Sequence, residues 1–287
     1  MHDWSGVAGK RVILTGATSG IGLAAARQLA SLGAELTIVA RSPARAAEAV
    51  ARIGAAAPGA APVEVIIADL AAQAEVRRVA AEILRRHTRV QVLVNNAGAI
   101  YGTRRLSPDG IELTWAVNHM APFLLTTLLL ERLGSSAPAR VITTSSAAHE
   151  RARIPFDDLQ AERAYRGWGF VRYGQTKLAN VLFTAELARR LAGSGVTANC
   201  FHPGFVASGF NLNNGRLMRL AMLVGHLFAR TPERGAETLV WLADSPEVAS
   251  ISGGYFVDKR LRRPAAAARD LDAARRLWQV SQALAGV

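Results

Sequence analysis

The chain has 287 residues, a formal net charge of +12 and one cysteine, and these values exclude several protein classes. Half of the residues are hydrophobic and 20% are charged, which is typical of a globular chain and excludes collagen, coiled coil and disorder. Cys200 alone permits neither an intrachain disulfide nor a cysteine-based metal cluster, so we expect a reducing, cytoplasmic setting. With no signal peptide and no run of about 18 apolar residues, we expect no transmembrane segment.

The positive charge comes from arginines that are scattered along the predicted helices. Only three of the 34 basic residues are lysines, namely Lys10, Lys177 and Lys259. Scattered arginine is typical of solvated helix faces, and no nucleic-acid-binding motif accompanies it. We therefore expect no nucleic-acid partner, and a basic nucleic-acid binder is only the third hypothesis.

Short runs rich in Val and Ile alternate with helical patterns along the chain. The predicted strands are residues 11–14, 35–40, 63–68, 90–94, 140–144, 196–201 and 255–257. The predicted helices are residues 21–32, 43–53, 73–87, 109–133, 171–191, 216–230 and 270–284. Strand, helix and strand in repetition predict an α/β fold, a Rossmann-like, doubly wound parallel sheet with right-handed crossovers.

No linker rich in Gly, Ser or Pro divides the chain, so we expect a single domain over residues 1–287. Its cofactor-binding and catalytic core would span about residues 10–210, a substrate lid residues 205–230, and a C-terminal extension residues 231–287. Two irregular stretches follow strand ends, at the edge where open α/β sheets bind their ligands.

A glycine-rich turn separates the first predicted strand from the first predicted helix. It reads T-G-A-T-S-G-I-G over residues 15–22. Glycine lets the backbone approach a pyrophosphate closely, and the N-terminus of the next helix offers free N–H groups and partial positive charge. The cofactor-binding residues predicted here are Gly16, Thr18, Ser19, Gly20, Ile21 and Gly22.

The end of the second predicted strand has no carboxylate. NAD-binding sites usually place Asp or Glu there, where it accepts a hydrogen bond from the ribose 2′-hydroxyl. This chain has Arg41, whose guanidinium can clamp a 2′-phosphate. The sequence therefore favours NADP(H) over NAD(H).

Tyr173 and Lys177 are four residues apart in a predicted helix and so share one face. We expect the positive charge of Lys177 to favour the phenolate and lower the pKa of Tyr173. Such a tyrosine can give a proton to a carbonyl oxygen or take one from an alcohol. Ser145 and Ser146 follow the strand at 140–144, where a hydroxyl can hydrogen-bond the substrate oxygen.

The ordered set of motifs makes the chain resemble the short-chain dehydrogenase/reductase family. The shared motifs are T-G-x-x-x-G-I-G at 15–22, Asp69-Leu70, N-N-A-G at 95–98, Asn118, Ser146, Y-x-x-x-K at 173–177 and Pro203-Gly204. Within the family, the chain is similar to the retinol dehydrogenase-like group. That similarity rests on residues 145–149, on Asn118-His119, on residues 122–126, 202–204 and 231–236, and on residues 254–256.

The resemblance implies a role for each residue at a matching position. Tyr173 would be the general acid and base, Lys177 would bind the nicotinamide ribose, and Ser146 would orient the substrate oxygen. Asn118 would hold a water that relays protons past Lys177. No metal is implied. The further cofactor-binding residues implied are Asp69, Leu70, Asn96, Gly98, Pro203, Val206 and Ser208, the last in place of the threonine that is common in the group.

Large apolar residues lie in the irregular stretches beside these motifs. Trp168, Phe170, Phe205 and Phe210 either line a pocket for a hydrophobic aldehyde, ketone or alcohol or pack a lid onto the sheet. The predicted helix at 216–230, apolar with basic flanks, is either that lid or a peripheral membrane-contact helix.

The leading hypothesis is an NADP(H)-dependent oxidoreductase that interconverts a hydrophobic carbonyl compound and its alcohol. The alternative is a non-catalytic NADP(H)-binding sensor of the same fold, against which the intact Ser146, Tyr173 and Lys177 argue. Pairing of the helices at 109–133 and 171–191 between two copies would give a homo-oligomer.

Overall fold

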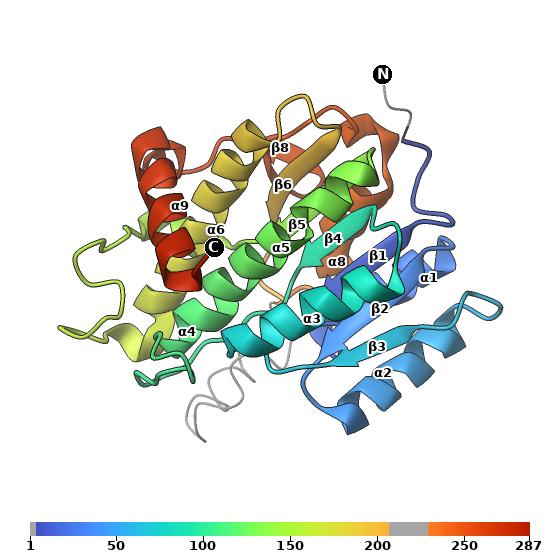
Figure 1. Cartoon of the computed structure of the whole chain (residues 1–287), viewed down its shortest axis with the longest axis horizontal. Helices are drawn as coiled ribbons and strands as arrows, with labels where there is room; N and C mark the ends of the chain where they lie inside the picture. The colour runs from blue at the N-terminus through green and yellow to red at the C-terminus, as the bar shows by residue number, and fades with distance from the viewer. Residues whose placement is uncertain (1–3, 207–228) are drawn as a thin grey trace.

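The structure is a computed structural model, and it describes residues 4–206 and 229–287. Within these residues a single eight-stranded sheet runs through the molecule (Figure 1). Its strands are β1 (Arg11–Thr15), β2 (Glu35–Ala40), β3 (Glu64–Ile67), β4 (Val92–Asn95), β5 (Ala139–Thr144), β6 (Val196–His202), β7 (Tyr255–Val257) and β8 (Arg260–Arg262).

The strand order is β3-β2-β1-β4-β5-β6-β7-β8, and every neighbouring pair is parallel except β7 and β8. The chain winds outward from β1 to β3, then crosses to β4 and winds outward the other way. This confirms the predicted doubly wound, Rossmann-like fold. The reversal between β1 and β4 is the switch point beside which such sheets bind ligands.

Helices cover both faces of the sheet (Figure 1). One face carries α3, α5, α6 and α9, and the other carries α1, α2 and α8. The helices are α1 (Gly20–Ser31), α2 (Pro43–Ala56), α3 (Gln73–Arg86), α4 (Leu113–Trp115), α5 (Ala121–Ser135), α6 (Phe170–Arg190), α8 (Pro232–Asp244) and α9 (Leu271–Ala285). A π-helical turn, η1 (Ala116–Met120), joins α4 to α5, and short 3-10 turns include η2 (Ala147–Arg151) and η3 (Gly167–Gly169).

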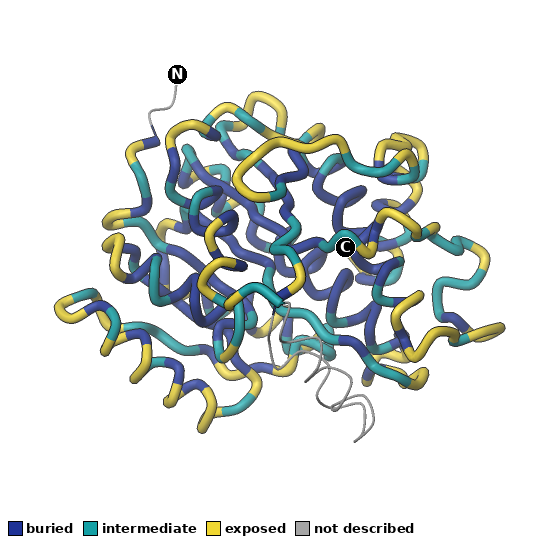
Figure 2. The backbone as a smooth tube through the Cα atoms, turned by 180° about the vertical axis from the view of Figure 1, so that it is seen from behind, coloured by how far each residue is buried: buried dark blue, intermediate teal, exposed yellow. Residues whose placement is uncertain are grey.

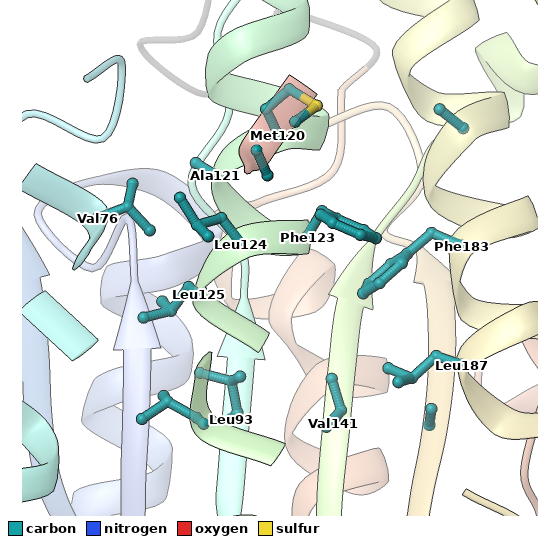
Figure 3. Close-up of a cluster of buried hydrophobic side chains, with 14 of the residues drawn as sticks. Val76, Leu93, Met120, Ala121, Phe123, Leu124, Leu125, Val141, Phe183 and Leu187 are labelled. Atoms are coloured by element: carbon teal, nitrogen blue, oxygen red, sulfur yellow. The ribbon is translucent and has the colours of Figure 1, made fainter. Parts of the chain in front are cut away.

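In the core on the α5 and α6 face of the sheet, Phe123 and Phe183 lie side by side among buried aliphatic side chains (Figure 3). The rings of Phe123 and Phe183 lie 5.8 Å apart, and Trp278 of α9 lies 5.1 Å from Phe123. The outer helices bury one stripe and expose the other, as Figure 2 shows by colour. On α2, Ile53 is buried and Arg52 is exposed. Arg52 therefore lies on a solvated helix face, as expected from the sequence.

Two described elements were not predicted from the sequence, and one predicted helix begins later than expected. Neither α8 nor the short edge strand β8 was predicted. The helix expected from residue 109 begins at Leu113, because the Glu112 carboxylate accepts the N–H groups of Thr114 and Trp115 and caps it there. Most of the helix predicted at 216–230 lies outside the described residues.

Among the residues that the structure describes, one helix is long and apolar enough, by length and composition only, to cross a membrane. It spans Leu113–Ser135 with a mean hydropathy of 1.3, because α4, η1 and α5 run on without a break. Within the fold, 78% of its apolar window is buried. Its hydrophobic side chains are therefore already used in the core.

Candidate active site

The glycine-rich turn leads from β1 into α1 at the carboxyl edge of the sheet. Gly16 has a φ of +72°, and a Cβ there would lie 2.7 Å from the Cα of Ala97. A Cβ on Gly22 would lie 2.1 Å from the carbonyl oxygen of Gly16. Ser19 precedes α1 without a side-chain cap, so the first N–H groups of the helix are available to an anion. These features fit a bound pyrophosphate beside Thr18, Gly20 and Ile21.

Asn96 ties together the ends of three strands beside this turn. Its Nδ2 donates to the carbonyl oxygens of Thr15 and Gly16, each at 3.2 Å. Thr144, at the end of β5, donates from Oγ1 to Asn96 Oδ1 at 3.2 Å. The ends of β1, β4 and β5 are thereby fixed beneath the place where a dinucleotide would bind.

Arg41 lies exposed at the end of β2, and Asp69 and Leu70 follow β3. The Tyr101 hydroxyl, from the loop after β4, lies close enough to the Arg41 guanidinium for the two to interact. Desolvation raises the pKa of Tyr101, and the Arg41 charge opposes that shift. Tyr101 is not among the predicted site residues, and its only signal in the sequence is an aromatic residue three positions after N-N-A-G.

Ser146, Tyr173 and Lys177 come together where β5 meets α6. The Ser146 side chain lies close enough to the Tyr173 hydroxyl to act on its pKa, and Lys177 Nζ lies 5.4 Å from the centroid of the Tyr173 ring. Lys177 is 3% exposed and donates to the Thr144 carbonyl oxygen at 3.0 Å. Ser145 donates from Oγ to the Lys177 carbonyl oxygen at 2.9 Å and so pins the strand to the helix.

Burial shifts the pKa of both titratable groups in this cluster. Desolvation raises the pKa of Tyr173 to about 12, and the hydrogen bond with Ser146 works in the other direction. Desolvation also lowers the pKa of Lys177 to about 8. The expectation of a lowered pKa for Tyr173 is therefore wrong for this structure, because desolvation of the phenolate outweighs the effect of Ser146.

Asn118 lies in the π-helical turn η1, a feature that is frequent at functional sites. Its Nδ2 donates to the Ala99 carbonyl oxygen at 2.8 Å and to Thr176 Oγ1 at 3.1 Å. Its Oδ1 accepts the Ala99 N–H at 2.7 Å. The side chain thus ties the loop after β4 to α6, while the implied water relay stays a prediction.

Gly98 lies against the same cluster. A Cβ there would come within 3.4 Å of Asn118 Oδ1 and 3.6 Å of Lys177 Nζ. The ammonium of Lys177 therefore lies between the N-N-A-G loop and the phenol of Tyr173, which joins the predicted cofactor residues to the predicted catalytic ones.

The segment after β6 runs past the glycine-rich turn. Pro203 and Gly204 lead into Val206, which forms a bridge with Arg230 and is 9% exposed. A Cβ on Gly235 would lie 2.6 Å from Val206 Cγ2 and 3.2 Å from Ile21 Cγ1, so Val206 lies close to the turn. Ser208 and Phe210 lie outside the described residues.

His149 is a buried residue to which the sequence analysis assigned no role. Its Nε2 accepts the Ala265 N–H at 3.3 Å, so Nδ1 carries the proton and donates to the Ser146 carbonyl oxygen at 2.8 Å. This hydrogen bond fixes the backbone of Ser146. The only signal in the sequence is the position of the histidine three residues after Ser146.

Three of the apolar residues near the site are exposed. Trp168, Phe170 and Phe205 are 59%, 49% and 55% exposed. In the described structure these three side chains therefore do not pack onto the sheet. Over residues 4–206 and 229–287, no group of three His, Cys, Asp or Glu side chains could hold a metal ion.

Comparison with known proteins gives matches over nearly the whole chain. The family model for short chain dehydrogenases matches residues 10–158. Human retinol dehydrogenase 14 is 41% identical over 298 residues, which cover 97% of this chain and 87% of that protein. Human retinol dehydrogenase 12 is 41% identical over 282 residues, which also cover 97% of this chain and 87% of that protein.

Solved structures show the same fold. An uncharacterized protein from Mycobacterium paratuberculosis matches with a TM-score of 0.78 and 31% identity, over 99% of this chain and 96% of that chain. A short chain dehydrogenase from Burkholderia cenocepacia in complex with NADP matches with a TM-score of 0.69 and 28% identity, over 87% of this chain and 96% of that chain.

Proposed function

The chain belongs to the short-chain dehydrogenase/reductase family of NAD(P)(H)-dependent oxidoreductases, and we propose that it interconverts a hydrophobic aldehyde or ketone and its alcohol with NADP(H). The observation that carries the proposal is the grouping of Ser146, Tyr173 and Lys177 at the carboxyl edge of the sheet. The glycine-rich turn, with its uncapped helix N-terminus, lies at the same edge.

The glycine-rich turn would hold the pyrophosphate of the dinucleotide, whose reduced nicotinamide would supply a hydride to the carbonyl carbon. Tyr173 gives its phenolic proton to the carbonyl oxygen, while the Ser146 hydroxyl donates a hydrogen bond to that oxygen and orients it. Lys177 carries the positive charge that stabilises the phenolate left behind. In the oxidative direction Tyr173 takes the proton of the alcohol.

Arg41 supports NADP(H) as the cofactor. No carboxylate stands at the end of β2 to bind a ribose 2′-hydroxyl, and the exposed guanidinium offers a fork to a 2′-phosphate. Tyr101 contacts Arg41 from the opposite loop and would add a hydroxyl there. The similarity to a dehydrogenase solved in complex with NADP agrees with this choice.

An apolar substrate follows from the residues around the site and from the relatives. Trp168 and Phe170 lie within five residues of Tyr173 in the chain, and both expose large apolar side chains, as does Phe205 after β6. The similar human proteins are named retinol dehydrogenases, and retinol is an apolar alcohol. We propose that the chain takes long or ring-bearing apolar carbonyl compounds.

The test is turnover with a panel of retinal, medium-chain aliphatic aldehydes, aromatic aldehydes and short polar aldehydes. The absorbance of reduced nicotinamide should fall with NADPH and an apolar aldehyde, and far more slowly with a short polar one. Tight NADPH binding without turnover on any carbonyl compound or alcohol would instead identify a dinucleotide sensor.

A further inference from the structure

Arg172, one residue before the proposed proton donor Tyr173, forms a buried ion pair with Glu112. Arg172 donates from Nε to Glu112 Oε2 at 2.7 Å, and the two side chains are 2% and 0% exposed. Glu112 immediately precedes α4, and Arg172 lies in the first turn of α6. The pair therefore joins the starts of the two helical segments that carry Asn118 and Tyr173.

The Glu112 carboxylate lies at two helix N-termini. It accepts the N–H groups of Thr114 and Trp115 at 3.0 and 2.9 Å and so caps α4. The first turn of α6 has neither a side-chain cap nor an acidic residue. A cation such as Arg172 is unfavourable there, because the N-terminus of a helix carries partial positive charge. The carboxylate of Glu112 offsets that cost.

The rest of the Arg172 guanidinium is held as firmly. Nη1 donates to Gln175 Oε1 at 3.2 Å, and Nη2 donates to the Leu159 carbonyl oxygen. The guanidinium lies over the Trp115 ring, 4.6 Å from its centroid. Directional bonds from three nitrogens fix both the plane and the position of this group, which a point charge would not do.

Neighbouring loops are tied to the same pair. The Tyr165 hydroxyl donates to the Tyr101 carbonyl oxygen at 2.7 Å and lies 3.4 Å from Glu112 Oε1. Gln160 accepts the Glu112 N–H at 2.7 Å. Gly169, just before α6, lies so close to the Tyr101 carbonyl that a Cβ would approach its oxygen to 2.0 Å. The start of α6 is thus fixed against α4 and against both loops.

We propose that Glu112 and Arg172 are positioning residues, which together set where the first turn of α6 places the Tyr173 hydroxyl relative to Ser146 and Lys177. The inference rests on the proposed function, since Tyr173 is the proton donor in that function. The pair acts through the helix and not by contact with the substrate, so its loss should lower kcat more than it weakens cofactor binding.

The test compares two variants of the pair with a matched control. Arg172→Met leaves Glu112 buried without its ion partner, whereas the double variant Glu112→Gln with Arg172→Met removes both charges. Arg189→Met is the control, because Arg189 pairs with Glu186 at 2.7 Å near the far end of the same helix and is 53% exposed. Steady-state kinetics, NADPH titration and urea unfolding are measured for each.

Both variants of the pair should lower kcat by about 10- to 100-fold, as expected for a small misplacement of a reacting group. NADPH affinity should stay within about twofold of the wild type, since the glycine-rich turn is untouched. The double variant should regain stability relative to Arg172→Met, because it leaves no unpaired buried charge, yet kcat should stay low. The control should match the wild type.

Recovery of kcat in the double variant, in step with stability, would mean that the pair is only structural and would overturn the inference. Hydrogen–deuterium exchange over residues 168–175 gives a readout without turnover. Exchange there should be faster in both variants and unchanged in the control, and unchanged exchange in Arg172→Met would also overturn the inference. If the wild type turns over no carbonyl compound but the hydrogen–deuterium exchange of the variants changes as expected, the proposed function is refuted and the effect of the ion pair on the start of α6 still stands.

Discussion

Two buried arginines, each stacked on a tryptophan, lie on opposite sides of the sheet along the strand direction, one at the carboxyl ends of the strands and one at their amino ends. Arg172 lies over Trp115 at the carboxyl edge and pairs with a carboxylate. Arg140, at the start of β5, lies 4.0 Å from the Trp4 ring centroid. It donates to the carbonyl oxygens that end α8, namely those of Leu242, Ala243 and Ser245, at 2.7, 3.2 and 2.8 Å.

The same side chain has a different effect at each end. Arg140 satisfies carbonyl groups at a helix C-terminus, where a cation is favoured, and it fastens the N-terminal segment and α8 to the sheet. Burial lowers the pKa of Arg140 to about 10, with the Asp244 charge opposing. Arg172 instead fixes the start of the helix that bears Tyr173. We therefore expect losses at the first end to appear in stability and losses at the second to appear in turnover.

We expect the largest effect from a substitution that removes only the proton transfer at the carboxyl edge. Tyr173→Phe should lower kcat by about 10²- to 10⁴-fold, because it removes the proton donor and leaves the ring in place. NADPH binding and the urea midpoint should hardly change. Turnover within about tenfold of the wild type would show that another group donates the proton.

At the opposite end, Arg140→Met should lower the free energy of unfolding by about 3 kcal/mol, because the carbonyl groups at the end of α8 lose their donor. The kcat of the folded enzyme should not change. Urea unfolding measures the loss, and Arg52→Met on the exposed face of α2 is the neutral control. A loss of turnover without a loss of stability would contradict the division between the two ends.

A smaller effect is expected at the rim of the cofactor site. Arg41→Ala should raise KM for NADPH by about 10- to 30-fold, the value of one or two charge-assisted hydrogen bonds to a phosphate. KM for NADH should change little, because NADH has no 2′-phosphate. Equal losses for both cofactors would assign Arg41 a structural role.

The smallest expected effect is a dependence of stability on pH. Because burial lowers the pKa of Lys177 from its ordinary value of 10.5 to about 8, the unfolded chain binds more protons at this residue between these two pH values. Wild-type stability should therefore rise relative to Lys177→Met by about 1 to 2 kcal/mol between pH 7.5 and pH 9.5. Urea unfolding of both proteins at each pH measures the difference, and a constant difference would contradict a buried ammonium.

The sequence revealed those features that are local in the chain. The alternation of strands and helices predicted the sheet, and the spacing of Tyr173 and Lys177 placed both on one face of α6, as the structure has them. The β8 strand was not predicted, because all three of its residues are exposed and its sequence therefore shows no burial pattern. For α8, the Thr231 cap and Pro232 were available as start signals.

Features that depend on distant contacts could not be predicted. The pKa of Tyr173 follows from how completely the fold removes water from its hydroxyl, which no local motif reports. Arg172 and Glu112 are 60 residues apart, and only the folded chain shows that they form an ion pair. The contacts of His149 with Ser146 and Ala265 are of the same kind.

The last helix has a consequence for assembly. On α9, Trp278 packs against Phe123 and Phe183, and Ser281 lies 2.8 Å from His119 Nε2. Helix α9 thereby covers part of α5 and α6, the two helices that the sequence led us to expect at a contact between two copies of the chain. We expect a chain shortened to end before Leu271 to expose Phe123 and Phe183 and to self-associate through these apolar side chains, which gel filtration beside the full chain would detect.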